Sequence, residues 1–218
     1  MKIAVMAGTP IDTNMGAVLL EKNGFSEGEI IRIPISENPV KQTIFQTSET
    51  EYKEKVINGH INNIKKADCN VLFVYCNSLS GAVDFEKLEK KNNIKIVTPM
   101  QIYREIAGKY KKIAVFAANA QGLAGIENAM FKGNSEINIT GMTFLEIVKE
   151  IEKGTLPEVI AEKFHFGKLT EYLKNLGNEA ILLGCTHFPY IESEIRKKSD
   201  MEIINPSQER LEKIKQKS

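Results

Sequence analysis

Two short segments of the sequence recur in similar form in its second half. The segment KIAVMA at residues 2–7 returns as KIAVFA at residues 112–117, which is 110 residues later. A second pair, VLFVYCN at 71–77 and AILLGCT at 180–186, has its cysteines 109 residues apart. Apolar strands resemble one another, so two such pairs can arise by chance. The stronger interpretation is a chain of two similar halves, each with an opening strand and a later strand that ends in cysteine.

Short apolar runs rich in Val, Ile and Phe alternate with amphipathic stretches. Continuous apolar runs are typical of strands that are covered on both faces of a parallel sheet. A helix is predicted over 50–66, and another over 157–176, which begins at a first-turn proline and closes before Gly177. Pro189 and Pro206 are predicted to open short helices. The runs predicted as strands are 2–7, 30–35, 71–76, 94–98, 112–118, 137–142, 179–184 and 201–204.

These patterns predict an α/β fold with two similar lobes, each a mainly parallel sheet flanked by helices. In open parallel sheets, ligands bind beyond the carboxyl ends of the strands. Lobes that face each other through those ends would place Cys76 and Cys185 on opposite sides of one cleft. The expected lobes are 1–98 plus 205–218, which carries Asp12 and Cys76, and 99–204, which carries Cys185 and His187.

Composition excludes several classes of protein. The 218 residues are 42% hydrophobic, which excludes disorder as the main state, and the net charge of +1 gives no reason to expect a nucleic-acid or membrane partner. The apolar start of the chain is too short for a signal peptide or a membrane span, so we expect a cytoplasmic protein. Three cysteines without CxxC spacing predict free thiols rather than disulfides.

Common cofactor motifs are missing. The sequence has no GxGxxG, GxxxxGK[ST] or HExxH motif, so nucleotide cofactors and zinc-protease chemistry lose their usual signals. A zinc site built from Cys76, Cys185 and His187 would lack metal-type spacing. We therefore expect neither a metal nor an organic cofactor.

Two facing thiols suit one kind of reaction. Stereoinversion at a carbon requires one group that removes a proton and a like group that returns it from the other face. An ordinary thiol has a pKa near 8.5, and a helix N-terminus or a cationic neighbour lowers that pKa. Cys76 and Cys185 both follow strands and precede polar turns, whereas Cys69 reads as a buried structural thiol.

Each of the two thiols has a candidate partner. His187 lies two residues after Cys185 and can exchange a proton with it. Asp12 follows the first strand, where it can pair with Cys76 or simply cap a helix, and the sequence does not decide between these two roles. His60 and His165 have no partner in sequence, so we expect them to be solvated or packed.

Several motifs resemble the cofactor-independent aspartate/glutamate racemase superfamily, and glutamate racemases most closely. GCTHFP at 184–189 resembles the GCTH[YF]P signature of that group, and CNS at 76–78 is similar to its first catalytic CNT. Asp12 and Thr13 with Gly16 resemble its DSGxGG opening. IVTP at 96–99 and INPS at 204–207 lie where the family has similar strand-end segments, so the likeness spans nearly the whole chain.

The resemblance implies a two-lobed enzyme, often a homodimer, that racemises a free amino acid without a cofactor, an activity tied to peptidoglycan biosynthesis. It also implies that Cys76 and Cys185 are the catalytic residues with Asp12 and His187 as their partners, and that Glu152 matches an additional glutamate of the family. Apart from the resemblance, the sequence offers hydroxyl and amide donors for a substrate carboxylate. The expected substrate-binding residues are Thr13, Asn77, Ser78 and Thr186, and the additional candidates are Asn14, Ser36 and Asn119.

The departures from the family pattern concern the substrate more than the thiols. Thr13 replaces serine, Ser78 replaces threonine, and the Pro-Tyr-Gly segment of glutamate racemases is absent, with residues 33–39 in its place. We therefore expect racemisation of an acidic amino acid, glutamate first, with aspartate or a broader substrate range as alternatives. A non-catalytic amino-acid-binding homologue is the alternative of another class, and a single-thiol decarboxylase or isomerase is a third.

Overall fold

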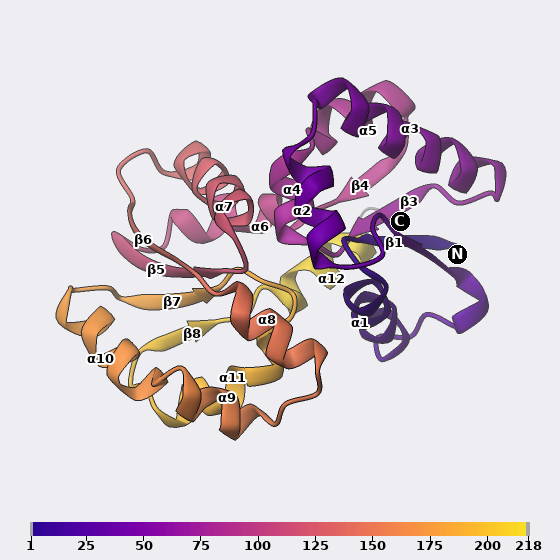
Figure 1. Cartoon of the computed structure of the whole chain (residues 1–218). Coiled ribbons are helices and arrows are strands. Elements are labelled where there is room, and N and C mark those ends of the chain that lie inside the picture. Colours follow the sequence, from indigo (N-terminus) through magenta and orange to yellow (C-terminus); the bar gives the residue numbers. More distant parts are fainter. Residues whose placement is uncertain (1, 217–218) are drawn as a thin grey trace. The chain divides into compact units, whose positions relative to one another are not determined.

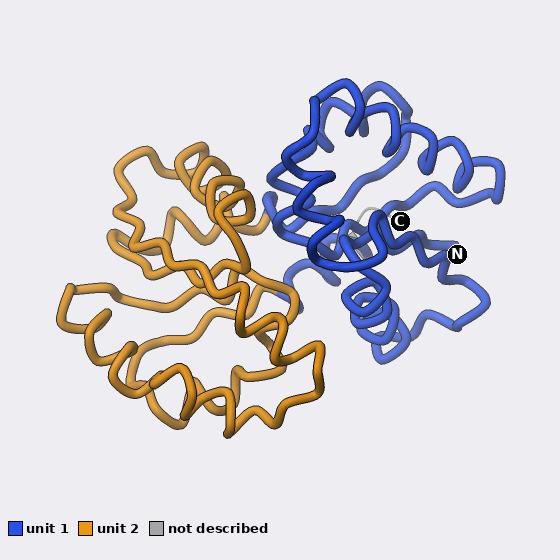
Figure 2. Tube along the Cα trace, viewed as in Figure 1, with its two compact units in different colours: residues 1–101, 207–218 blue, residues 102–206 orange. Residues whose placement is uncertain are grey.

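The structure, a computed structural model, describes residues 2–216. The chain divides into two compact units (Figure 2). Unit 1 is Met1–Gln101 with Ser207–Ser218, and unit 2 is Ile102–Pro206. The first border lies inside helix α6 (Pro99–Ala107), three residues after the border expected from the sequence, and the second lies two residues after the expected one. Cys76 and Asp12 belong to unit 1, and Cys185 and His187 to unit 2.

Unit 1 is built on a four-stranded parallel sheet of order β2-β1-β3-β4 (Figure 1). Its strands are β1 (Ile3–Ala7), β2 (Ile30–Pro34), β3 (Val71–Val74) and β4 (Lys95–Val97). Its helices are α1 (Pro10–Glu21), η1 (Glu27–Glu29), α2 (Pro39–Thr47), α3 (Thr50–Lys66), α4 (Asn77–Ala82), α5 (Phe85–Asn92) and α12 (Ser207–Gln216).

Unit 2 repeats this plan with a four-stranded parallel sheet of order β6-β5-β7-β8. Its strands are β5 (Lys112–Ala117), β6 (Asn138–Thr143), β7 (Ala180–Leu183) and β8 (Glu202–Ile204). Its further helices are α7 (Ala120–Gly133), α8 (Leu145–Glu152), α9 (Pro157–Lys163), α10 (Phe166–Asn175), η2 (Phe188–Ile191) and α11 (Glu192–Lys197).

The matching strand orders explain why similar segments recur in the two halves of the sequence. KIAVMA forms β1 and KIAVFA forms β5, and each is the second strand of its sheet; the strands before the two cysteines, β3 and β7, are each the third. The predicted α/β fold with two similar parallel sheets is confirmed. Each of the eight predicted runs overlaps a strand, and the buried strands β1, β3 and β7 have the unbroken apolar sequence typical of a parallel sheet.

The edge strands differ from this expectation. All residues of β1, β3 and β7 are buried, whereas β2 and β6 are only partly buried. Each of these two strands pairs with one neighbour, at the edge of its sheet. These two strands are therefore not covered on both faces, unlike the strand that an unbroken apolar run predicts.

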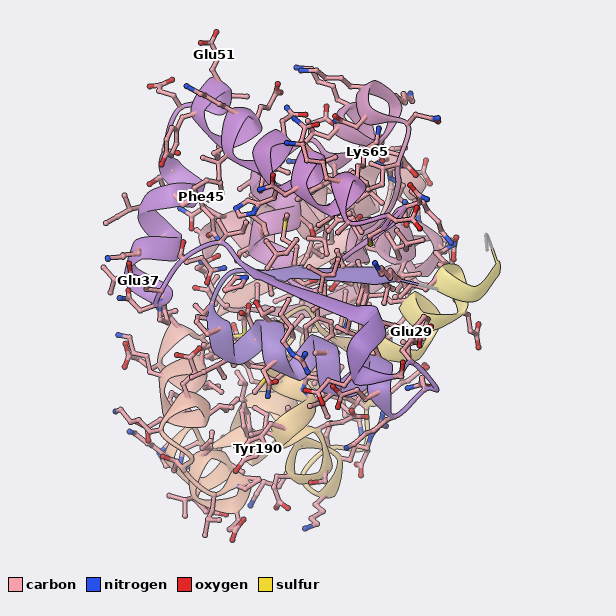
Figure 3. The ribbon with its side chains drawn as sticks, turned by 90° about the vertical axis from the view of Figure 1, so that its right-hand side faces the viewer. Glu29, Glu37, Phe45, Glu51, Lys65 and Tyr190 are labelled. Carbon is pink, nitrogen blue, oxygen red and sulfur yellow. The ribbon has the colours of Figure 1, made fainter. Side chains whose placement is uncertain are left out.

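The helix predicted over 50–66 is confirmed as α3, which buries Ile57, Ile61 and Ile64. The charged residues of its outer face are exposed, and Figure 3 shows Glu51 extending away from the ribbon.

A single helix over 157–176 is wrong. The chain leaves the helix between α9 and α10, where His165 has the left-handed φ of 50°. The break directs Phe166 into the core, where its fully buried ring stacks on Phe116 with centroids 6.5 Å apart. Proline opens η2 as expected, whereas Pro206 stands one residue before α12.

Candidate active site

Two of the three thiols occupy matching places in the two sheets. Cys76 lies two residues after the end of β3 and is the N-cap of α4. Cys185 lies two residues after the end of β7 and precedes η2. All three cysteines are free, and the exposed fractions are 4% for Cys76 and 6% for Cys185 but 0% for Cys69. The two matching thiols are therefore at carboxyl ends of parallel strands, where such sheets bind ligands.

Cys185 is the first member of a hydrogen-bonded row of three side chains. Its Sγ lies 3.8 Å from Nδ1 of His187, and Nε2 of His187 lies 3.1 Å from Oε1 of Glu152. In the tautomer that carries its proton on Nε2, His187 donates to the Glu152 carboxylate and Nδ1 faces the thiol as an acceptor. Proton transfer from Sγ to Nδ1 would leave a thiolate beside an imidazolium ion that Glu152 stabilises.

The row is held by contacts between the Cys185 turn and the end of α8. Tyr190 Oη donates a hydrogen bond of 3.2 Å to the backbone oxygen of Thr155. Thr155 donates in turn to Glu150, with Oγ1 and Oε2 2.9 Å apart. This bond, together with Lys163 and Lys153, lowers the pKa of Glu150 to about 2. The turn after α8 is thereby fixed on both sides of Glu152.

Glycine is required directly before Cys185. A Cβ at residue 184 would meet Ile126 Cδ1 at 2.5 Å and the backbone oxygen of Phe116 at 2.9 Å. The backbone of residue 184 also donates a 2.8 Å hydrogen bond to the oxygen of Phe116. The end of β7 therefore packs closely against β5 and α7, and this contact sets the direction in which Cys185 leaves the sheet.

Cys76 has a different set of neighbours. Gln42 of α2 donates from Nε2 to Cys76 Sγ at 3.2 Å and to Ser78 Oγ at 3.3 Å. Gln46, one turn later on α2, donates from Nε2 to Ser78 Oγ at 2.8 Å, and Ser78 Oγ lies 3.5 Å from Cys76 Sγ. Gln42 and Ser78, which bond to this thiol, are neutral side chains, in contrast to the histidine and carboxylate beside Cys185.

The two glutamines were missed by sequence reasoning, although a signal exists. Their spacing of four places them on one face of a helix that follows the second strand, and Gln46 is buried with only 3% of its surface exposed. The spacing is the signal in the sequence, whereas the burial of Gln46, which requires a hydrogen-bond partner, is seen in the structure alone.

Asp12 takes part in capping a helix, which is one of the two roles expected for it. Thr9 caps α1, and Asp12 is the third helical residue of a capping box. Its carboxylate accepts from Gly8 N at 3.2 Å, Thr9 N at 2.6 Å and Thr9 Oγ1 at 2.9 Å. Thr13 also turns back, since its Oγ1 donates to the backbone oxygen of Thr9 at 2.7 Å. Both side chains therefore organise the turn after β1.

The remaining predicted site residues fall into two groups. Asn77, Ser78 and Thr186 are buried directly after the two thiols. Asn14 is exposed on α1, and Asn119 caps α7 by accepting from the backbone of residue 122 at 2.9 Å.

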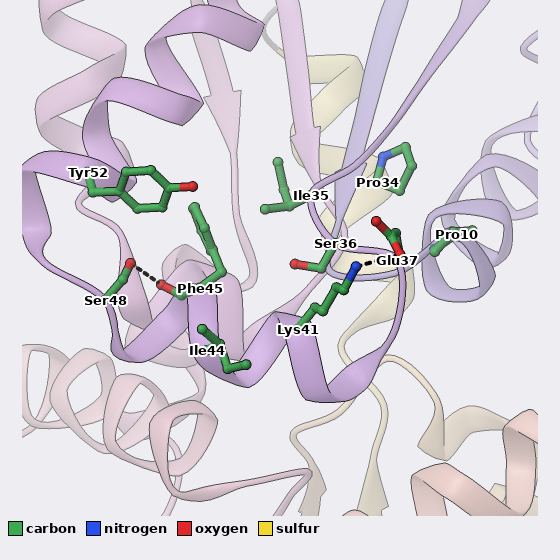
Figure 4. Close-up of a pocket in the computed structure, with 10 residues that line it drawn as sticks. All are labelled: Pro10, Pro34, Ile35, Ser36, Glu37, Lys41, Ile44, Phe45, Ser48 and Tyr52. Atoms are coloured by element: carbon green, nitrogen blue, oxygen red, sulfur yellow. Dashed lines mark hydrogen bonds and ion pairs between the residues drawn. The ribbon is translucent and has the colours of Figure 1, made fainter.

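Ser36 lines a pocket of about 380 Å³ within unit 1 (Figure 4). One face of α2 borders this pocket, whereas Gln42 and Gln46 of another face bond to Ser78. The lining residues are Pro10, Pro34, Ile35, Ser36, Glu37, Lys41, Ile44, Phe45, Ser48 and Tyr52.

The residues expected to be structural lie apart from these groups. Cys69 donates its thiol proton to backbone oxygens of Val71 and Lys2, and burial raises the pKa of this thiol. His165 is exposed at the helix break, and His60, on α3, has its pKa lowered by burial. Among residues 2–216, no group of three His, Cys, Asp or Glu side chains is placed to hold a metal ion. No helix in this described range is long and apolar enough to cross a bilayer.

Comparison with known proteins supports the resemblance carried by the motifs. The sequence matches no family model. It is 27% identical to a glutamate racemase of Fusobacterium nucleatum over 169 residues, which are 73% of this chain and 60% of that protein. It is 24% identical to a glutamate racemase of Clostridium kluyveri over 201 residues, 88% of this chain and 76% of that protein. The chain thus spans about 60% of the length of the first of these relatives.

Solved structures share the fold. Glutamate racemase of Francisella tularensis in complex with D-glutamate matches with a TM-score of 0.70 at 18% identity, covering 99% of this chain and 80% of that one. An aspartate racemase homologue of Pyrococcus horikoshii matches with a TM-score of 0.67 at 15% identity, covering 99% of this chain and 97% of that one. The resemblance to aspartate and glutamate racemases is thereby confirmed, and the shared architecture is the two-sheet α/β fold.

Proposed function

We propose that this protein is a cofactor-independent amino acid racemase that interconverts the enantiomers of an acidic amino acid, glutamate first. The observation that carries the proposal is the placement of Cys76 and Cys185. Each lies two residues beyond the third strand of an equivalent sheet and within hydrogen-bonding distance of a polar side chain two positions later. Relatives named glutamate racemase are similar in sequence, at 24–27% identity, over most of this chain.

In the proposed reaction, one thiolate removes the proton from the α-carbon and the other thiol donates a proton to the opposite face. The product is the other enantiomer, and the two sulfur atoms have exchanged protonation states. His187 receives the proton of Cys185 and prepares its thiolate. Ser78 adds a hydroxyl beside Cys76. Asp12, the expected partner of Cys76, contributes here through the turn that it holds.

The substrate carboxylates need hydrogen-bond donors. Asn77 and Thr186 supply an amide and a hydroxyl next to the two thiols, and the first turn of α4 presents backbone N–H groups. Neutral donors of this kind can hold a carboxylate without a cationic side chain. An acidic amino acid therefore fits the proposed site, with Thr13 in a supporting role because its hydroxyl is already bonded within α1.

Aspartate is the second candidate substrate. The chain covers 97% of the Pyrococcus horikoshii aspartate racemase homologue, compared with 80% of the Francisella tularensis glutamate racemase. The Pro-Tyr-Gly segment of glutamate racemases is also absent from residues 33–39. A homodimer, as implied by the resemblance, remains part of the proposal.

The proposal is tested by exchange in heavy water. Individual L- and D-amino acids are incubated with the protein, deuterium at the α-carbon is followed by NMR, and the enantiomers are separated by chiral chromatography. We expect glutamate or aspartate to gain deuterium and racemise. Binding of an amino acid without exchange would favour a binding protein, and turnover of only basic or hydrophobic amino acids would refute the acidic substrate.

A further inference from the structure

We infer that Gln42 is a positioning residue that favours the thiolate form of Cys76 by donating a hydrogen bond from its neutral amide to the sulfur. The catalytic consequence rests on the proposed function, whereas the effect on the thiol can be measured without it. The first observation is direct: Gln42 Nε2 lies 3.2 Å from Cys76 Sγ. A hydrogen bond to the charged form of a group favours that form.

The second observation concerns the direction of the Ser78 hydrogen bonds. A hydroxyl has one proton and two acceptor lone pairs. Gln42 and Gln46 both donate to Ser78 Oγ, at 3.3 and 2.8 Å, so both lone pairs are occupied. The hydroxyl proton is then left for Cys76 Sγ at 3.5 Å. The sulfur thus receives an N–H and an O–H donor, an arrangement that suits an anionic acceptor.

A third observation fixes the amide of Gln42 in space. The side-chain amide occupies the position that a Cβ at residue 8 would take, so any side chain there would displace the amide from its place. The backbone of Gly8 is held in turn by Asp12, and the N-cap of α2 accepts from Lys41 N at 3.0 Å. The amide is therefore wedged between the turn after β1 and the thiol, which limits its rotation.

The two units place different polar side chains near their strand-end cysteines. In unit 2, Glu152 follows β6 in the chain and bonds to His187, two residues after its cysteine. In unit 1, Gln42 and Gln46 follow β2 and bond to Ser78, also two residues after its cysteine. The equivalent helices thus carry different residues: α8 supplies the titratable Glu152, whereas α2 supplies the neutral Gln42 and Gln46.

The experiment measures the rate at which iodoacetamide alkylates Cys76 at neutral pH. The parent is the full chain with Cys69→Ala and Cys185→Ala, so that Cys76 is its one thiol. Gln42→Met keeps the length of the side chain and removes the donor, and we expect the rate to fall about tenfold, the size of one lost hydrogen bond to a charged acceptor. Gln42→Glu should slow alkylation further, because a carboxylate repels the thiolate.

Gln101→Met serves as the matched control, since Gln101 donates to the backbone oxygen of Ile96. We expect this variant to alkylate at the parent rate. Urea unfolding of each variant identifies any loss of fold. Alkylation of folded Gln42→Met at the parent rate would overturn the inference.

Racemase assays of the single variants, with all cysteines kept, separate this inference from the proposed function. We expect Gln42→Met to lower kcat with a smaller effect on KM. Slowed alkylation in a protein that racemises no amino acid would retain the role of Gln42 and reject the racemase.

Discussion

The three cysteines make the sharpest residue-level prediction. Cys76→Ala and Cys185→Ala should each reduce racemisation to below about a tenth of the wild-type rate, equivalent to about 1.4 kcal/mol of barrier, because each removes the acid/base group of one face. Cys69→Ala should stay active, because this thiol is fully buried and bonded to backbone oxygens. Turnover is measured by chiral chromatography, with circular dichroism to verify folding. Loss of activity in a folded Cys69→Ala variant would mean that a different thiol acts.

Glu152 offers a second test at the residue scale. Glu152→Gln keeps the size of the side chain and removes the charge that stabilises protonated His187, so we expect kcat to fall about 10- to 100-fold. The primary isotope effect, measured with substrates deuterated at the α-carbon, should change more in the direction in which Cys185 is the base.

Glu146→Gln is the matched control for this test. Glu146 lies on the same helix but pairs with Lys149 instead of His187. The isotope effects of this variant should equal those of the wild type. Equal changes in both directions for Glu152→Gln would contradict the assignment of His187 to Cys185 alone.

Asp12 should affect stability through its capping box. Asp12→Ala removes three hydrogen bonds to the turn after β1, and we expect the free energy of unfolding to fall by about 1–2 kcal/mol. Asp12→Glu keeps a carboxylate that can reach back to the cap and should lose less. Urea denaturation measures both changes. An unchanged free energy of unfolding for Asp12→Ala would show that the capping box contributes nothing measurable.

At the scale of elements, the close contact of α1 with its sheet can be tested. A Cβ on Gly16 would lie 2.8 Å from Tyr75 Cβ and from Val5 Cγ2. The helix would have to shift away from the sheet, so Gly16→Ala should destabilise the protein by about 1–3 kcal/mol. The exposed Gly59 of α3 has nothing within 4 Å of its Cβ position. Gly59→Ala should therefore stabilise by up to about 1 kcal/mol. Thermal unfolding of both variants checks these opposite signs, and a shift of the same sign would refute the packing argument.

The strands and helix α3 could be predicted because the burial of one face or of a whole strand leaves a pattern among neighbouring residues. The apolar runs identified every strand, and the isoleucines of 50–66 identified α3, since a covered face leaves a regular pattern. The break at His165 was missed because it results from the packing of Phe166 on Phe116, which lies far away in the chain. Tertiary contacts of this kind leave no periodic signal.

The candidate site was predictable to a similar extent. The strand-end cysteines and His187 could be recognised because their partners are two residues away, and Glu152 was found only through a resemblance. Gln42 was missed because its contact with Cys76 joins residues 34 positions apart in the sequence. The capping role of Asp12 was one of the two expected, but the spacing from β1 does not reveal that Thr9, two residues after the strand, is the N-cap and that Asp12 is the third helical residue.

For the whole molecule, the two units differ in how the chain builds them. Unit 2 is one continuous segment with its own four-stranded sheet, whereas unit 1 is completed by α12, which returns after unit 2. Leu211 and Ile214 of α12 are buried in the core of unit 1, and Lys95 Nζ donates to the backbone oxygen of Ile214 at 2.7 Å. Arg210 adds a cation–π contact with Tyr75, the residue before Cys76. Unit 2 is therefore expected to fold without the rest of the chain, whereas unit 1 is expected to need α12 for its full stability.

This difference predicts how separate fragments behave. Residues 102–206 alone should give a folded domain with a cooperative urea transition, because the segment is continuous, lies in the usual size range of about 50–250 residues and contains a complete sheet. Residues 1–101 alone should be markedly less stable, because they lack the apolar side chains of α12. Joining 207–218 to that fragment through a flexible glycine-serine linker should restore cooperativity. Near-ultraviolet circular dichroism and urea titration measure all three fragments. A fragment 102–206 without fixed tertiary structure, or a fragment 1–101 as stable as its α12-linked form, would show that the units do not fold in the way their chain connectivity indicates.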